Sequence, residues 1–257
     1  MSLLIRRLLS ASLLSLVLSS PAMAIVNTLP APGKEVSGLS GSATLKGSVK
    51  TGNTDIVDVG LSGAAIYGSE QFQTSLRASF NYGEKSDETY LYNTFEHLRF
   101  RFKLNDWLTP EAFLQHQFNE FRAIKFRGLF GLGAAFTLWE SNGDYIVLGA
   151  TFMLEREVAN GEAITLASKA IVSRLSNYVQ FAFKTDNDVT FSSTVFVQPL
   201  LADFNDLRIY NESGFSVNVH ENIAVGTSFK LTYDSKPLTE DVEKLDTATL
   251  AKLTFKF

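Results

Sequence analysis

Apolar and polar residues alternate with a period of two along most of the chain from Leu39 onward. The alternation is clearest over 245–257, where the odd positions are apolar or threonine and the even positions include Asp246, Lys252 and Lys256. Successive side chains of a β-strand point to opposite faces, so each such segment predicts a strand with one apolar and one polar face. Helical periodicity is absent from this part of the sequence.

The alternation predicts about twelve antiparallel strands. They are expected over residues 39–50, 56–68, 71–83, 89–104, 107–119, 125–139, 144–157, 165–184, 188–200, 206–219, 222–235 and 245–257. Short turns are expected at one end of the strands, and longer loops, among them 83–88 and 201–205, at the other. This layout is typical of a transmembrane up-and-down β-barrel with both termini on the short-turn, periplasmic side. The predicted fold class is therefore all-β, a transmembrane antiparallel up-and-down barrel.

A soluble β-sandwich or lipocalin-like barrel would also alternate, so two further observations distinguish these classes. The predicted strands have about 10–14 residues, whereas strands of globular proteins commonly have about 5–6. The polar face also carries repeated bases, since Arg99, Arg101 and Lys103 alternate with Phe100 and Phe102. In a membrane barrel the apolar face meets lipid and the polar face lines the lumen, which fits this chain better.

Aromatic residues gather near the predicted strand ends, as in the interfacial girdles of membrane barrels. The girdle candidates are Tyr67, Phe72, Tyr82, Tyr90, Tyr92, Trp107, Trp139, Tyr145, Phe255 and Phe257. Glu96 does not fit the pattern, because it falls on the apolar face of its strand. Either a β-bulge or a place near the membrane interface would explain it.

The first 24 residues have the features of a secretory signal peptide. Arg6 and Arg7 precede an apolar run over 8–18, and Ala22 and Ala24 form an Ala-x-Ala cleavage site. The run is too short to cross roughly 30 Å of hydrocarbon, which argues against an N-terminal membrane anchor. The expected organisation is a signal peptide over 1–24, a flexible lead-in over 25–38 and an outer-membrane barrel over 39–257.

Composition narrows the remaining classes. The chain has 257 residues, of which 45% are hydrophobic, 12% aromatic and 19% charged, which argues against disorder. It contains no cysteine, so disulfides and cysteine metal sites are excluded. A formal net charge of -4 gives no electrostatic case for a nucleic-acid partner.

The end of the sequence predicts a partner during biogenesis. Phe257 is the terminal residue, and Leu253 and Phe255 lie on the same face of the last predicted strand. This arrangement looks like the C-terminal signal that the barrel-assembly machinery reads in bacterial outer-membrane proteins. The alternative is an ordinary last strand.

The mature chain resembles a family of barrels described as salt-induced outer-membrane proteins (the YdiY type), a domain of unknown function. The matching motifs, between residues 50 and 257, are Lys50-Thr51-Gly52-Asn53-Thr54, Glu120-Phe121-Arg122, Arg127-Gly128, Gly131-Leu132-Gly133, Tyr233-Asp234-Ser235-Lys236-Pro237, Asp246-Thr247 and Phe257. The family tends to place an aromatic residue after Gly-x-Gly, where this chain has Ala134-Ala135-Phe136. The resemblance implies an outer-membrane barrel and a link to salt or osmotic conditions, but no catalytic residue.

The polar face supplies the candidate functional residues. The residues that the alternation directs into the lumen include Arg77, Arg99, Arg101, Arg127, Arg174, Arg208, Glu155 and Glu212. Lumen charges can set the selectivity of a pore, so an excess of bases predicts a preference for anions. The alternative is that arginine and glutamate pair across the lumen and fill it.

The sequence gives little support for catalysis. Trp139-Glu140-Ser141-Asn142-Gly143 faintly resembles the His-x-Ser-Asn motif of outer-membrane lipid hydrolases, but tryptophan replaces the base that a serine nucleophile needs. His97, His116 and His220 lie far apart and lack metal-ligand spacing. Gly128, Gly131 and Gly133 lie in a predicted strand, where glycine usually permits a bend or close packing. We therefore expect no enzyme activity, no cofactor and no metal.

The expected location is the bacterial outer membrane, with its lipids and lipopolysaccharide as partners. Acidic residues in the longer loops, Glu84, Asp87, Glu88, Glu240, Asp241 and Glu243, could bind the divalent ions that bridge lipopolysaccharide, or could simply be solvated. The expected function is a small-solute pore or an envelope-integrity protein. An outer-membrane lipid-modifying enzyme and a surface binding or adhesion barrel are the alternatives.

Overall fold

A computed structural model describes residues 29, 37–52, 55–159, 170–185, 189–220, 223–238 and 242–255. Twelve strands and one short 3-10 turn, η1, make up the regular structure of this part. They are β1 (Gly38–Lys50), β2 (Ile56–Gly68), β3 (Phe72–Lys85), β4 (Glu88–Phe102), β5 (Leu108–Asn119), η1 (Glu120–Arg122), β6 (Ile124–Ser141), β7 (Asp144–Ala159), β8 (Ile171–Lys184), β9 (Val189–Leu200), β10 (Asp203–His220), β11 (Ile223–Asp234) and β12 (Leu245–Phe255). Within these residues, no helix is long and apolar enough to span a membrane.

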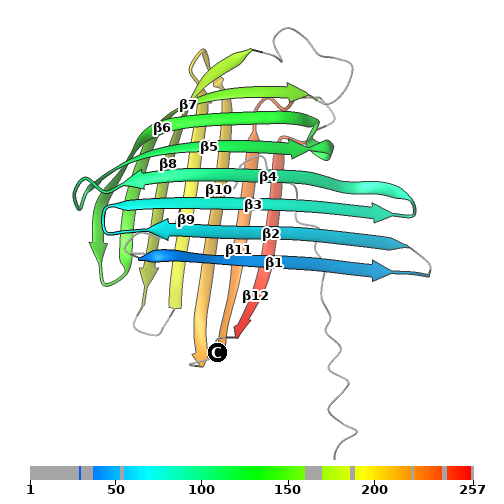
Figure 1. Ribbon diagram of the computed structural model, residues 1–257, viewed down its shortest axis with the longest axis horizontal. Coiled ribbons are helices and arrows are strands. Elements are labelled where there is room, and N and C mark those ends of the chain that lie inside the picture. The colour runs from blue at the N-terminus through cyan, green and yellow to red at the C-terminus, as the bar shows by residue number, and fades with distance from the viewer. Residues whose placement is uncertain are drawn as a thin grey trace, which may run out of the picture.

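All twelve strands form one sheet in which each strand pairs antiparallel with the next along the chain. The sheet curls strongly, so that β1–β4 lie in front of β9–β12 and cross them at a steep angle in Figure 1. Among the described residues no ladder joins β1 to β12. The predicted all-β, antiparallel, up-and-down order of twelve strands is confirmed.

The predicted strand bounds hold to within three residues, except that the part of the eighth segment before residue 170 lies outside the described residues. The prediction of longer loops over 83–88 and 201–205 is wrong. Strands β3 and β4 continue to a two-residue turn at Ser86 and Asp87, whose φ angles of 49° and 64° are left-handed. Strand β10 begins at Asp203, so Leu201 and Ala202 alone connect it to β9.

Period-two alternation gives the sheet two different faces. In β7 the pattern of exposure alternates at almost every residue, with Val147, Thr151 and Met153 buried and Leu148 and Phe152 exposed. Residues that pair across neighbouring strands point to the same side of the sheet, so each side is continuous across β6, β7 and β8. We call the side that holds the buried side chains the inner face and the opposite side the outer face.

The two faces are inverted relative to a soluble protein. Most of the buried residues are polar or charged, including five arginines. Large apolar side chains instead stand exposed on the outer face, for example Leu76, Leu114, Leu132, Phe152 and Phe229. Soluble proteins rarely expose so extensive an apolar surface, which marks contact with lipid or another protein.

The girdle residues are divided between the faces. Trp107, Trp139 and Tyr67 are more than two-fifths exposed, and the Trp107 and Trp139 rings pack against Phe136 and Phe183. The assignment of Tyr145 to a girdle is wrong, because its side chain is buried. It belongs instead to an apolar cluster on the inner face, where Val147, Tyr178 and Tyr210 are among the other members.

Two glycines of β6 permit close packing, as expected. A Cβ atom at Gly131 would lie 2.2 Å from the Phe113 ring, and one at Gly133 would lie 2.1 Å from the Ala150 carbonyl oxygen. Backbone atoms cannot move aside as a flexible side chain can. The space at Gly133 is therefore available only to glycine.

Replacing Gly133 by alanine is expected to destabilise the protein by about 1–3 kcal/mol through overpacking. Urea unfolding of protein refolded in detergent micelles measures the effect. Gly63→Ala in β2 is the control, because the nearest atom to a Cβ there is 3.5 Å away. Equal stability of the two variants would contradict the packing at Gly133.

Candidate functional site in the polar inner face

The structure places all eight charged lumen candidates on the inner face. Of these, Arg99, Arg127, Glu155, Arg174 and Arg208 are buried, while Arg77, Arg101 and Glu212 are half-buried. Six of them, all except Arg77 and Glu212, fall into two groups separated along the strands. One group surrounds Glu155, near the end of the sheet at which β7 stops and β8 begins. The other surrounds Glu111, nearer the opposite end of the strands.

Glu155 of β7 is the centre of the first group, and its side chain is 1% exposed. Arg127 Nε of β6 donates to Glu155 Oε1 at 2.7 Å, and Arg174 Nε of β8 donates to Oε2 at 2.6 Å. Arg208 Nη1 of β10 also donates to Oε1. One carboxylate thus binds three guanidinium groups from three strands.

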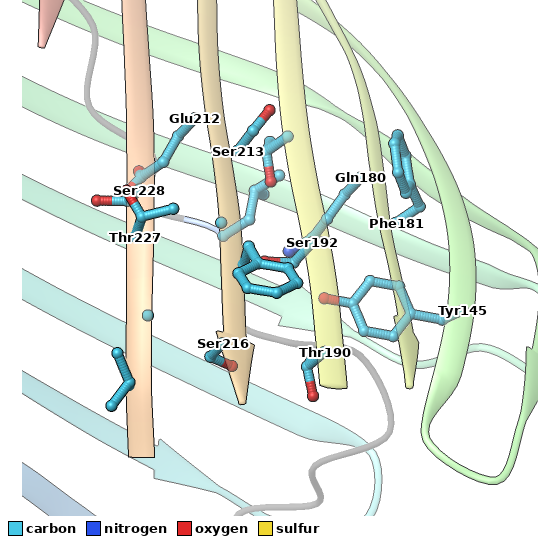
Figure 2. A pocket seen from close by; sticks show the side chains of 16 residues that line it. Tyr145, Gln180, Phe181, Thr190, Ser192, Glu212, Ser213, Ser216, Thr227 and Ser228 are labelled. Carbon is cyan, nitrogen blue, oxygen red and sulfur yellow. The ribbon is translucent and has the colours of Figure 1, made fainter. Parts of the chain in front are cut away.

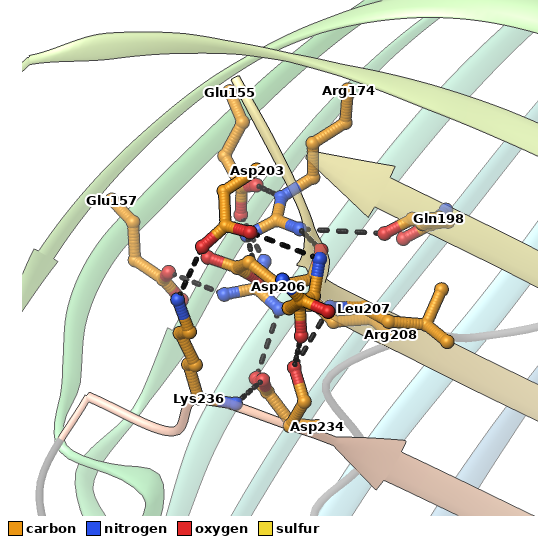
Figure 3. Close-up of polar contacts among 12 residues, drawn as sticks. Glu155, Glu157, Arg174, Gln198, Asp203, Asp206, Leu207, Arg208, Asp234 and Lys236 are labelled. Carbon is orange, nitrogen blue, oxygen red and sulfur yellow. Dashed lines mark hydrogen bonds and ion pairs between the residues drawn. The ribbon is translucent and has the colours of Figure 1, made fainter. Parts of the chain in front are cut away.

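Three further acids bind the arginines of this group (Figure 3). Arg208 donates to Glu157 Oε2 at 2.8 Å and to Asp234 Oδ2 at 2.9 Å. Arg174 donates to Asp206 Oδ1 at 2.8 Å. We call the seven residues Arg127, Arg174, Arg208, Glu155, Glu157, Asp206 and Asp234 the ionic network.

Strand register explains why these residues meet. Arg127 pairs with Glu157 across β6 and β7, and Arg208 pairs with Asp234 across β10 and β11. Asp206 enters through an irregularity, since the β9–β10 register shifts between Asp203 and Leu207. Sequence reasoning placed Asp206 at a strand start and missed its role, because alternation does not reveal a bulge.

The same end of the sheet carries two more ion pairs. Arg122 of η1 is 8% exposed and lies 3.0 Å from Asp246 of β12, joining the middle of the sheet to its last strand. At the rim, Lys236 Nζ donates to Asp203 Oδ2 at 2.6 Å. Arg122 was quoted only as part of a family motif, and nothing in the alternation pointed to it.

The second group is richer in base. Glu111 Oε2 lies 3.0 Å from Arg99 Nη1 and 3.6 Å from Arg101 Nε, and it accepts a hydrogen bond from the Tyr178 hydroxyl at 3.3 Å. The Arg99 guanidinium also lies 4.9 Å from the centre of the Phe113 ring. One acid here faces two arginines, whereas the ionic network holds more acids than bases.

A chamber of about 340 Å³ lies beside the strand ends of β8–β11 that face away from the ionic network. Figure 2 shows Thr190, Ser192 and Ser228 from neighbouring strands around it, with Tyr145 at one side. Leu29 of the N-terminal lead-in also lines the chamber and is only 5% exposed. A residue that precedes the sheet is thus seated against its inner face.

The histidines occupy different environments. His97 is buried on the inner face and bonds with Gln115 through Nδ1 at 3.0 Å. His116 lies on the outer face, where its Nδ1 is 2.6 Å from Glu96 Oε2. The β4–β5 ladder runs through Glu96 without a shift, so no bulge explains that residue. The side chain of His220 lies outside the described residues, and within them no group of three or more histidines and acids could hold a metal ion.

Ser141 of the weak hydrolase motif sits beside a turn. Ser141 pairs with Asp144, and between them Asn142 and Gly143 adopt φ angles of 53° and 89°. Two left-handed residues with the sequence Asn-Gly are typical of a type I′ hairpin turn. The turn accounts for this sequence without any catalytic role.

The two terminal signals lie mostly beyond the described residues. Ala22, Ala24 and Phe257 fall outside them. Leu253 and Phe255 belong to β12, where they pair with Val225 and Ile223 of β11. Of the acidic loop residues, Glu240 and Asp241 also fall outside the described part of the chain.

Comparison with known proteins places the sheet in one family. A family model described as a protein of unknown function, DUF481, matches residues 43–257, which covers β2–β12 and most of β1. No curated protein matches the chain.

Proposed function

We propose that this chain, which belongs to the family of proteins of unknown function DUF481, is an outer-membrane β-barrel with a narrow passage for small polar solutes. In this proposal the ionic network forms the constriction of the passage at one end. The chamber beside β8–β11 forms its vestibule at the other end.

The membrane assignment rests on one observation, that the outer face of the sheet is apolar and exposed whereas the inner face is polar and buried. Large apolar side chains on the outer face remain exposed in the described part of the sheet, as Leu132 does at 59% exposure. A bilayer is the environment in which such a face is favourable, because lipid-facing residues of membrane barrels are apolar and interior residues are polar. The expected signal peptide over 1–24 supports the same location.

Membrane insertion also requires the sheet to close. An unpaired strand edge leaves backbone groups without hydrogen bonds, and each such group costs several kcal/mol in hydrocarbon. We therefore propose that β1 pairs with β12 in the membrane. Both are edge strands of a sheet with an even number of strands, so they run antiparallel to each other.

Two charged groups, the ionic network around Glu155 and the group around Glu111, lie at different heights along the strands and support the proposed passage. Arg99 and Arg101 share one acid, Glu111, so this group carries excess positive charge. An interior of this kind favours anions over cations. The ionic network favours a second candidate, a filled barrel that contributes to envelope integrity without conducting.

Planar-bilayer recording of the refolded mature protein under a salt gradient distinguishes these two functions. Discrete current steps with an anion-biased reversal potential are the expected result. Steps with a cation bias would keep the passage and overturn the role of the arginines. Persistent silence from correctly folded protein would overturn the passage and leave the filled barrel.

Leu29→Ser is expected to increase the conductance severalfold. Leu29 packs into the inner-face apolar cluster and lines the chamber, so a smaller polar residue at this position would widen the vestibule. The same bilayer recording measures the change. A conductance equal to that of the unmodified protein would show that Leu29 does not narrow the passage.

A further inference from the structure

We infer that the chamber beside β8–β11 is a binding site for a neutral, polyhydroxylated solute of about monosaccharide size. The inference deepens the proposed passage and rests on it, since it names the class of solute that the vestibule selects. It depends on the floor of the chamber, on its charge and on one buried hydroxyl group.

The floor of the chamber is built from small and hydroxyl-bearing residues on three adjacent strands. Cα pairing aligns Ser192 of β9, Gly214 of β10 and Ser228 of β11 in one row across the sheet. A second row joins Thr190, Ser216 and Gly226. Gly214 and Gly226 place no side chain in the chamber, and the hydroxyl groups of the serines and Thr190 around them can both donate and accept hydrogen bonds.

The chamber offers almost no net charge to a ligand. Glu212 is the one charged residue among those that line it in the described structure. Its Oε1 lies 3.7 Å from Lys230 Nζ, and its Oε2 accepts a hydrogen bond from the Tyr210 hydroxyl at 2.9 Å. A carboxylate already balanced in this way gives little attraction for a cation. The lining therefore favours a neutral ligand over either ion.

Ser228 gives a specific reason to expect a ligand. The residue is 5% exposed, and its Oγ is buried without a hydrogen-bond partner in the described structure. Buried polar groups are nearly always paired, and an unpaired one costs free energy. A ligand hydroxyl that reached Ser228 from the chamber would remove this cost.

The size and lining of the chamber narrow the class of ligand further. Ligand pockets commonly have volumes of about 300–1,000 Å³, so a chamber of about 340 Å³ suits a small molecule. Leu29, Phe181 and the ring carbons of Tyr145 add apolar surface to the lining. A sugar ring has an apolar face and a rim of hydroxyl groups, and the chamber presents both complements.

Saturation-transfer NMR on the full mature chain, refolded in deuterated micelles, tests the site. The probes are methyl α-glucopyranoside as the neutral sugar, glucuronate as its anionic counterpart and glucosamine as its cationic counterpart. A saturable signal for the neutral glucoside that exceeds both charged sugars is the expected result. No saturable signal for any probe, or a preference for a charged sugar, would overturn the inference.

Two variants locate the binding. Ser228→Ala is expected to weaken glucoside binding about five- to tenfold, as loss of one hydrogen bond does. Its fold should be unaffected, because the hydroxyl has no protein partner to lose. Gly214→Leu should abolish binding by filling the chamber. Ser79→Ala, on the inner face of β3 and away from the chamber, is the matched control.

These outcomes separate the two proposals. Glucoside binding that is unchanged in Ser228→Ala and Gly214→Leu would place the sugar elsewhere and overturn the site. Conductance without glucoside binding would overturn the inference and leave the passage intact. Binding in the chamber without conductance would remove the passage and, with it, the vestibule role of the site.

Discussion

Leu132→Arg is expected to destabilise the bilayer-embedded protein by about 2–4 kcal/mol, the cost of a lipid-facing base at the middle of a membrane barrel. Leu132 lies near the middle of β6 on the outer face, between Ala112 of β5 and Phe152 of β7. It is 59% exposed. In a soluble protein the same change at so exposed a position would be nearly neutral, usually within about 0.5 kcal/mol.

Urea unfolding of protein refolded into vesicles measures this cost, and Leu138→Arg provides the matched control. Leu138 lies on the same strand and is also 59% exposed, but it is close to the turn at Asn142 and Gly143. Near the interface a base costs only about 0–1 kcal/mol. Equal effects at the two positions would contradict a depth-dependent lipid environment.

Glu155→Gln is expected to lower the free energy of unfolding by about 3–5 kcal/mol, which is the usual effect of removing one partner from a buried ion pair. Glutamine keeps the shape of the side chain but leaves Arg127, Arg174 and Arg208 without their shared carboxylate. The three guanidinium groups would then repel one another at the centre of the ionic network. Unfolding in urea, followed by the loss of heat-modifiable mobility in gels, measures the loss.

Glu140→Gln is the control for this change. Glu140 is exposed near the turn between β6 and β7, so its replacement should leave stability within about 0.5 kcal/mol of the unmodified protein. If Glu155→Gln were as mild as Glu140→Gln, the network would be solvated and open. That result would remove the structural basis for a constriction at the ionic network.

The fold could be predicted from the sequence because alternation is a local property of each strand. The same parity that placed Arg127 and Glu155 on one face also determines their register in the sheet, where Arg127 pairs with Glu157 and Leu129 with Glu155. Long strands with one apolar face leave little freedom of register, because a shift of one residue would turn every side chain to the wrong face.

The remaining features depend on tertiary contacts that alternation does not encode. The Glu96–His116 pair joins two strands across the outer face, so neither residue alone explains the other. Asp206 reaches Arg174 only because the β9–β10 register shifts beside it. Tyr145 is a different case, because the alternation does place its ring on the inner face with the apolar cluster, and only its position near a strand end suggested a girdle.

Collision rates of a spin label along β3 test the central proposal, that the outer face of the sheet contacts lipid. The chain contains no cysteine, so single-cysteine variants can be labelled at residues 76–80 without background. In vesicles, labels at Leu76, Ala78 and Phe80 should collide readily with oxygen and poorly with a water-soluble nickel complex. Labels at Arg77 and Ser79, which are half-buried on the inner face, should show the reverse preference. Ready access of the nickel complex to all three outer positions would place that face in water and contradict a membrane barrel.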